Sequence, residues 1–568
     1  MYENRAALGY QNFEEVRTGQ IFYIDKTDFI REWWENADKV TLITRPRRFG
    51  KTLNLSMVNC FFSNQYAERS DLFEGLSIWE EKAEGAKYRN LQGTYPVIFL
   101  TFANIKAVRY SDMEYKITEV IAALFNRNRY LLEGNILSEQ ERKYYESIGV
   151  GMDGKAAAGA IHAMAEFMQR YYGKKVIILL DEYDTPMQEA WLWGYWDEAV
   201  TLFSSLFNAT FKTNDVLERG LITGITRIAK ESIFTGMNNL EVVTTTSNKY
   251  AVSFGFTEKE VFAALEAAGL GGQKQKVKRW YDGFTFGRCT DIYNPWSIVS
   301  FVNKKVYDTY WCNTSGNELV NSLIQTGTPG VKQAMEELLQ GKSFETELDE
   351  RIAFDQLGDS ANAVWSLLLA TGYLKVVTFK QVGKLQRKIY TLKLTNMEVE
   401  SIFEDMVKGW FSGNTEVYYN EFIRALLTDN VRKMNTFMNK VALHTFSSFD
   451  SGNKPSDDAE PERFYHGFVL GMVVNLADTY KVRSNRESGY GRYDVMIEPL
   501  DKTGKAFIFE FKVLDPDEDE ETLEDTIANA HRQIQEKKYE AELIAAGFLP
   551  KQIRKYGFAF RGKECLIG

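Results

Sequence analysis

Short apolar runs of strand length alternate with longer stretches of helical periodicity along the first half of the chain. The runs occupy 39–44, 94–105, 176–180 and 219–228, and apolar residues between them recur at three- and four-residue spacing. Strands that alternate with helices predict a parallel sheet with helices on both faces. The pattern therefore predicts an α/β domain over residues 1–270.

The pattern changes twice after this domain. A helical, aromatic-rich stretch at about 256–345 leads into helix, strand, turn, strand and helix between 364 and 411. That order resembles a winged-helix module. We expect a helical and winged-helix-like region at 271–430, followed by a second α/β domain at 431–568.

The expected hairpin of the winged-helix-like region is basic, with Lys380, Lys384, Arg387 and Lys388. One interpretation is a wing that touches a phosphate backbone. The simpler one is a solvated hairpin, because edge strands often carry lysine for solubility.

Composition restricts the class of protein. The net charge of −10 argues against a protein that passively coats nucleic acid. Four scattered cysteines and four histidines show no zinc-ligand spacing. No leader peptide and no apolar run of membrane-spanning length is visible, so we expect a cytoplasmic protein without a membrane partner.

The stretch TLITRPRRFGKTLNLSM starts at Thr41 and has the order strand, loop, helix that a phosphate-binding loop needs. Lys51 would reach the outer phosphates of a nucleotide, and the Thr52 hydroxyl would ligate Mg²⁺. Arg45 stands where the general motif has its first glycine. A basic turn is the alternative. The candidate cofactor-binding residues of the loop are Arg48, Phe49, Gly50, Lys51, Thr52 and Leu53.

A second motif supports the loop. The strand in KKVIILLDEYDTPM ends at Asp181 and Glu182, where a carboxylate can hold Mg²⁺ and its neighbour can polarise an attacking water. A third strand is followed by Thr226 and Arg227. They are a candidate phosphate sensor and a candidate charge stabiliser, or else a capping threonine and a surface arginine.

A third constellation lies near the C-terminus. RYDVMIEP and AFIFEFKV predict adjacent strands that carry Asp494 and Glu510 with Lys512. Glu510 and Lys512 are two apart and share a face. Such charges inside a small sheet are costly unless they are paired or bind a metal. Two carboxylates on Mg²⁺ and a nearby ammonium are suited to phosphodiester hydrolysis, and Asp…Glu-x-Lys is the pattern of the PD-(D/E)XK superfamily.

Taken together, these motifs resemble bacterial AAA-ATPase-like proteins with a C-terminal PD-(D/E)XK nuclease domain. FYIDKTDFI, TRPRRFGKTLNLSM, LLDEYDTPM, WYDGFTFG and IYNPWSI carry the resemblance. It implies that an Arg-Pro-Arg-Arg-Phe-Gly-Lys loop is usual, and that ATP and Mg²⁺ are the cofactors. Glu462, a candidate further metal ligand, and Gln533, a candidate water or phosphate contact, lie on flanking helices that match the same family. His466 is expected to be structural.

Three hypotheses follow. The first is an ATPase coupled to Mg²⁺-dependent hydrolysis of nucleic acid, with DNA favoured over RNA. The second is an ATP-driven switch whose nuclease-like domain binds without cutting. The third, a kinase-like phosphotransferase, is disfavoured because Asp181 and Glu182 suit water as the acceptor. Assembly with further copies of the chain stays open.

Overall fold

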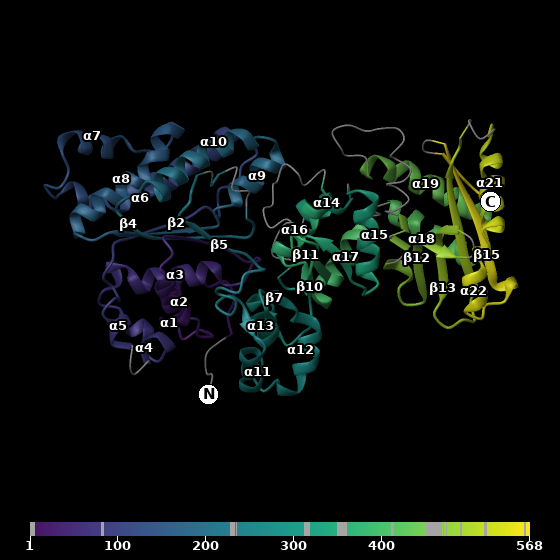
Figure 1. Cartoon of the computed structure of the whole chain (residues 1–568), viewed down its shortest axis with the longest axis horizontal. Helices are drawn as coiled ribbons and strands as arrows, with labels where there is room; N and C mark the ends of the chain where they lie inside the picture. The colour runs from purple at the N-terminus through teal and green to yellow at the C-terminus, as the bar shows by residue number, and fades with distance from the viewer. Residues whose placement is uncertain are drawn as a thin grey trace. The chain divides into compact units, whose positions relative to one another are not determined.

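A computed structural model gives the arrangement of the 568-residue chain (Figure 1). It describes residues 6–80, 85–227, 233–234, 236–311, 318–325, 327–348, 360–409, 414–449, 468–469, 471–472, 474–488, 491–515, 520–561 and 564–568. The chain divides into two compact units. Unit 1 comprises Met1–Ser315, Thr346–Tyr390 and Thr395–Glu398, and unit 2 comprises Gly316–Glu345, Thr391–Leu394 and Val399–Gly568.

Unit 1 is built on a five-stranded parallel sheet, which confirms the fold class expected for this part of the chain. Its order is β2-β3-β4-β1-β5. β4 therefore separates β1, which leads into the loop, from β3, which ends at Asp181. The strands are β1 (Val40–Thr44), β2 (Val97–Thr101), β3 (Val176–Asp181), β4 (Leu217–Gly224) and β5 (Leu240–Val243).

Helices cover both faces of this sheet. Figure 1 shows α6, α8 and α10 on one face and α1, α2 and α3 on the other. α8 begins where Asp153 accepts from the Ala156 N–H, and it ends at Gly173 with a φ of +66°. The helices are α1 (Phe13–Thr18), α2 (Asp28–Asn36), α3 (Lys51–Phe62), α4 (Ser77–Glu80), α5 (Gly85–Arg89), α6 (Tyr110–Arg127), α7 (Glu139–Ser147), α8 (Gly154–Tyr172), α9 (Thr185–Trp193) and α10 (Trp196–Phe207).

The segment after the sheet contains strands as well as the expected helices. The end of WYDGFTFG and the start of IYNPWSI lie in two short antiparallel strands, where Phe284 and Phe286 alternate with Thr285 and the chain turns at Gly287, φ +57°. The elements are β6 (Phe256–Thr257), α11 (Glu258–Ala267), α12 (Lys274–Tyr281), β7 (Phe284–Phe286), β8 (Cys289–Tyr293) and α13 (Pro295–Lys304).

The winged-helix-like order is present. α16 (Ala361–Thr371) ends at Gly372, φ +91°, and is followed by β10 (Leu374–Val382), β11 (Arg387–Leu394) and α17 (Met397–Gly409). β11 pairs with β10 on one side and with β9 (Phe344–Glu347) on the other. Before them lie α14 (Glu318–Gln325) and α15 (Pro329–Leu339).

The C-terminal sheet of unit 2 has the order β12-β13-β14-β15-β16, with β14 and β15 parallel and the other neighbours antiparallel. Ile534 of α21 packs on one face against Met496 and Ile508, and Phe422 of α18 contacts Phe558 of β15 on the other. The elements are α18 (Asn414–Leu427), α19 (Val431–Phe449), β12 (Tyr480–Ser488), β13 (Gly491–Pro499), β14 (Ala506–Val513), α21 (Leu523–Glu536), α22 (Ala541–Ala545), β15 (Ile553–Arg561) and β16 (Glu564–Ile567).

None of the helices in the described part of the chain is both long enough and apolar enough to cross a membrane.

Candidate functional sites

The loop between β1 and α3 curls around the side chain of Lys51. Gly50, with a φ of +79°, is the N-cap of α3 and has no side chain of its own to accept from the first N–H groups of the helix. The Lys51 ammonium donates to the carbonyls of Arg45 and Pro46, at 3.0 and 2.8 Å. A buried ammonium beside a helix N-terminus is an arrangement suited to phosphate oxygens.

Asp181 lies beside this loop and is held by two threonines. Its Oδ2 accepts from the Thr52 hydroxyl at 2.7 Å, and its Oδ1 accepts from the Thr223 hydroxyl at 2.6 Å. Thr52 comes from the first turn of α3, and Thr223 comes from β4, the strand between β1 and β3. The structure thus brings Thr52 and Asp181 together, as a shared Mg²⁺ site requires.

Burial dominates the electrostatics around the loop. It lowers the pKa of Lys51, while Glu182, Asp181 and Asp184 act in the opposite direction. Burial also raises the pKa of Asp181, and the hydrogen bonds from Thr223 and Thr52 oppose that shift. A bound cation would favour the charged carboxylate in the same way.

Glu182 adopts a left-handed backbone conformation, with a φ of +51°, directly after β3. Few non-glycine residues adopt this conformation, and those that do often lie at functional sites. Thr185 donates to the Glu182 carboxylate at 3.3 Å. Glu182 thus follows Asp181 at the end of the strand, and its role as the group that polarises water stays a prediction.

Thr226 is engaged with a carboxylate. Its N–H and its hydroxyl both donate to Asp184 Oδ2 at 2.8 Å, and the Ile225 N–H donates to the same oxygen at 3.0 Å. Asp184 is fully buried, whereas Arg227 is half-buried. Asp184 therefore fixes the segment after β4, and the proposed phosphate contact of Thr226 stays a prediction.

Arg45 does not face the loop. Its guanidinium is fully buried and lies 4.5 Å from the ring centre of Phe286 in β7. Burial lowers the pKa of Arg45 to about 9, so the side chain is still charged at neutral pH. It donates to the carbonyls of Thr44, Thr244, Lys249 and Tyr250. Arg45 therefore joins the loop to the segments that follow the sheet.

The side chains of Arg48, Phe49 and Leu53, the last from the first turn of α3, pack against other parts of unit 1. Phe49 is buried and its ring contacts those of Phe284 and Phe286, with centroids 4.7 and 5.4 Å apart. The Arg48 guanidinium stacks 4.3 Å from the ring centre of Trp296, and Leu53 packs on the core beneath the sheet. The side chains of Phe49 and Leu53 are thus engaged in packing, and the expected nucleotide contacts of these two residues stay a prediction.

The C-terminal sheet brings Asp494 and Glu510 together. In the antiparallel pairing of β13 and β14, Val495 lies opposite Phe509. One residue further along, Asp494 therefore lies opposite Glu510, and the two side chains point to the same face of the sheet. The Phe511 N–H donates to Asp494 Oδ2 at 2.7 Å. Lys512 follows on the same face, because side chains two apart on a strand point the same way.

The Glu510 carboxylate is incompletely satisfied. Gln533 of α21 donates to its Oε1, while its buried Oε2 has no hydrogen-bond partner among the described residues. Burial, with the Asp494 charge adding to it, raises the pKa of Glu510, and burial also raises the pKa of Asp494. A buried carboxylate oxygen without a partner is a fitting ligand for a divalent cation.

Glu462, the expected additional metal ligand, and His466 lie outside the described residues.

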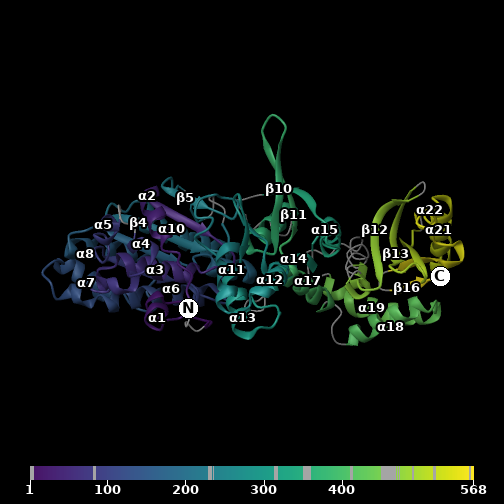
Figure 2. The same ribbon diagram turned by 90° about the horizontal axis from the view of Figure 1, so that it is seen from below.

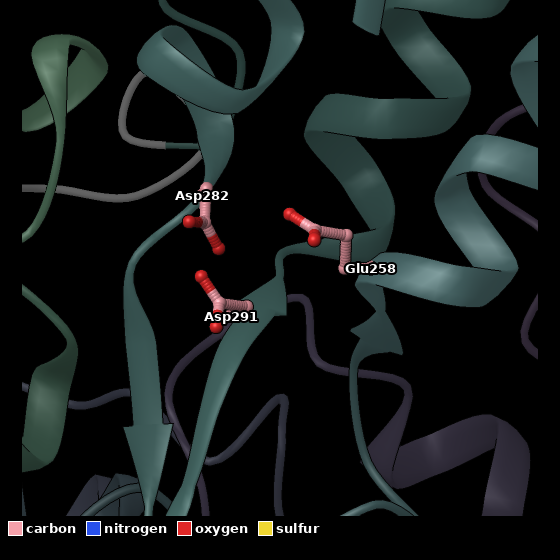
Figure 3. Close-up of side chains that lie close together, drawn as sticks. All are labelled: Glu258, Asp282 and Asp291. Atoms are coloured by element: carbon pink, nitrogen blue, oxygen red, sulfur yellow. The ribbon is translucent and has the colours of Figure 1, made fainter. Parts of the chain in front are cut away.

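A further group of carboxylates lies in the segment after the sheet. Figure 3 shows Glu258, Asp282 and Asp291 facing one another, and their oxygens lie within 4.8 Å. The Lys278 ammonium contacts Glu258 and lies 3.0 Å from Asp291 and 3.9 Å from Asp282. Burial, then the contact with Asp291, raises the pKa of Asp282 to about 7. These three carboxylates thus have a cation supplied by the chain.

The sequence interpretation missed three contributors: Thr223, Asp184 and the buried role of Arg45. Thr223 could have been found as the polar residue inside the apolar run LITGI, and Asp184 could have been found as the third acid of LLDEYDTPM. No local signal distinguishes a buried Arg45 from an exposed one.

Comparison with known proteins agrees with this geometry. Residues 7–234 match the family described as "Predicted AAA-ATPase", and residues 460–568 match the PD-(D/E)XK nuclease superfamily. An uncharacterized protein in the vnfD 5' region of Azotobacter chroococcum mcd 1 is 24% identical over 538 residues, which cover 91% of this chain and 90% of that protein. The chain therefore carries an AAA-ATPase-like domain and a C-terminal domain of the PD-(D/E)XK nuclease superfamily, which confirms both resemblances.

Proposed function

We propose that this protein binds and hydrolyses ATP and that its nucleotide state controls Mg²⁺-dependent hydrolysis of nucleic acid, with DNA as the favoured substrate. The observation that carries the proposal is the pairing of Asp494 with the buried Glu510, whose Oε2 has no hydrogen-bond partner among the described residues, in the same chain as a phosphate-binding loop. Mg²⁺, when bound at either site, would neutralise phosphate charge and lower the pKa of a bound water.

In the ATPase domain, each residue has a task suited to its position. The Lys51 ammonium neutralises charge on the outer phosphates, and the first N–H groups of α3 bind their oxygens. Thr52 and Asp181 hold the ion, and Thr223 orients Asp181 through the hydrogen bond to Oδ1. Glu182 accepts a proton from the attacking water.

In the C-terminal domain, Asp494 and Glu510 hold the ion. The Phe511 N–H and the Gln533 amide fix the two carboxylates and leave Oε2 of Glu510 to bind the metal. Lys512 stabilises negative charge that develops on the phosphate. The burial that raises both carboxyl pKa values makes their charged forms dependent on a cation.

The experiment uses the purified full chain with Mg²⁺ on single-stranded and duplex DNA and RNA, with and without ATP. We expect cleavage of DNA that changes with ATP and falls by at least about 100-fold in Glu510→Gln. Glu524→Gln is the matched control, because Glu524 is an exposed acid on the neighbouring helix α21.

Equal cleavage by Glu510→Gln and wild type would assign the activity to another site or to a contaminant. ATP turnover without cleavage of any substrate would support the alternative function, an ATP-driven switch whose nuclease-like domain only binds.

A further inference from the structure

The hairpin β10–β11 ends in a run of exposed residues. All twelve residues at 377–388 are exposed, and Figure 2 draws the two strands as a long, narrow ribbon. The run, VTFKQVGKLQRK, contains four basic residues and no acidic one, in a chain whose net charge is −10. The charge of the ribbon is therefore opposite to that of the protein as a whole.

Large apolar side chains share this surface. Val377, Phe379, Val382 and Leu385 are 56, 47, 39 and 78% exposed. Lysines on an edge strand are explained by solubility, but exposed valine, phenylalanine and leucine on the same strands oppose it. Solubility thus explains the basic residues but not the exposed apolar ones, whereas a binding surface explains both.

The ribbon has a fixed base and an exposed end. Leu374, Leu392 and Leu394 are buried at the base, and Tyr390 stacks near Phe379, with ring centroids 5.7 Å apart. Side chains alternate between the faces, so Val377 and Phe379 lie on one face and Lys380 and Val382 on the other. Each face therefore mixes cationic or polar groups with apolar ones.

A duplex groove offers this combination of surfaces. Its walls carry phosphates on both sides, and its floor offers base edges and thymine methyl groups. The DNA major groove admits a two-stranded β-ribbon, whereas the major groove of duplex RNA is too narrow for one. We propose that the β10–β11 hairpin inserts into a groove of duplex DNA, with its lysines on phosphates and its apolar residues on the bases, while Arg387 pairs with Glu347 of β9 at 3.8 Å. This inference rests on the proposed function, because it names the surface that binds the DNA substrate.

The test measures equilibrium binding of the full chain to a fluorescent 30-base-pair DNA duplex in EDTA, so that metal-dependent cleavage plays no part. We expect the combined substitution Lys380→Gln, Lys384→Gln and Lys388→Gln to weaken binding at low salt by roughly tenfold or more. The slope of log K against log salt should fall by about 2 to 3, which is close to one unit per lost phosphate contact.

Two further variants sharpen the test. Phe379→Ser with Leu385→Ser should weaken binding and leave the salt slope unchanged, because apolar contacts release no counterions. Lys143→Gln, Lys155→Gln and Lys259→Gln together are the matched control, since they remove three exposed lysines elsewhere in unit 1 and should bind DNA as wild type does.

The proposal is overturned if the hairpin variant binds like the control, or if the wild type binds no duplex DNA. Tighter binding to duplex RNA, to single strands or to anionic phospholipid vesicles would overturn it as well. Binding in EDTA does not depend on cleavage, so failure here leaves the nuclease assignment intact, and an inactive nuclease would leave this result intact.

Discussion

Asp181 and Glu510 are both buried carboxylates at candidate magnesium sites, yet the chain satisfies them differently. Both Asp181 oxygens accept hydroxyl hydrogen bonds, from Thr223 and Thr52. Among the described residues, Gln533 donates to Oε1 of Glu510, and Oε2 has no hydrogen-bond partner. The described residues thus satisfy both oxygens of Asp181, whereas they leave one oxygen of Glu510 for the cation that we propose there.

The largest expected effect separates the two sites by activity. Lys51→Ala should lower ATP hydrolysis by at least about 100-fold, because the substitution removes the cation facing the outer phosphates. Glu510→Gln should leave hydrolysis unchanged. Phosphate release measured at saturating ATP checks both variants, with Lys155→Ala as an exposed-lysine control. Undiminished hydrolysis in Lys51→Ala would refute the assignment of the loop.

The next effect is on stability. Asp181→Ala should lower the free energy of unfolding by about 2–4 kcal/mol, because Thr52 and Thr223 both lose their acceptor. Glu510→Gln should change it by less than about 1 kcal/mol in metal-free buffer, since the amide still accepts from Gln533. Urea unfolding measures both, and a cycle with Thr223→Val isolates the hydrogen bond. Equal losses in the two variants would abolish the distinction drawn between the sites.

Magnesium should distinguish the sites in the absence of ATP. At tenfold its Kd, Mg²⁺ should stabilise the wild type by about 1.4 kcal/mol. Lys51→Ala should keep this response and Glu510→Gln should lose it, because the described residues offer no hydrogen-bond partner to Glu510 Oε2. Thermal unfolding with 0 and excess Mg²⁺ provides the measurement. A response that survives in Glu510→Gln would place the ion elsewhere.

A further effect, on the pH dependence of stability, concerns the carboxylates around Lys278. The pKa of Asp282 is raised to about 7, so its protonated form favours the folded state. Its contribution to stability is fully present below about pH 4 and is lost as the pH rises through 7. Relative to the wild type, Asp282→Asn should therefore gain about 2–3 kcal/mol between pH 5 and 8. Unfolding midpoints at four pH values test the sign, and a constant difference would contradict it.

The sequence predicted the elements that carry periodicity and the residues that carry motifs. β1, α3 and β3 form where apolar runs precede the loop and the acidic pair, and β13 and β14 form as a hairpin that carries Asp494 and Glu510. These features are local, so a short stretch of chain determines them.

What the sequence did not predict depends on contacts between distant residues. Thr223 meets Asp181 only because β4 is placed between β1 and β3, a matter of strand order. The β7–β8 pair was expected to be helical, because it lies inside the aromatic-rich stretch at about 256–345 that was expected to form helices. Its strands have only three and five residues, too few to show a clear alternation. The exposure of Phe379 and Leu385 in the hairpin is likewise invisible in one sequence, where they resemble core residues.

The buried guanidinium of Arg45 has a consequence for protein engineering. A designer who replaced Arg45 with glycine, to restore the general phosphate-loop motif, would remove hydrogen bonds to four carbonyls and leave a void against Phe286. The loop therefore cannot be transferred to another protein by itself. To transplant it into another scaffold, one would have to move 244–250 and 284–286 with it as a single module.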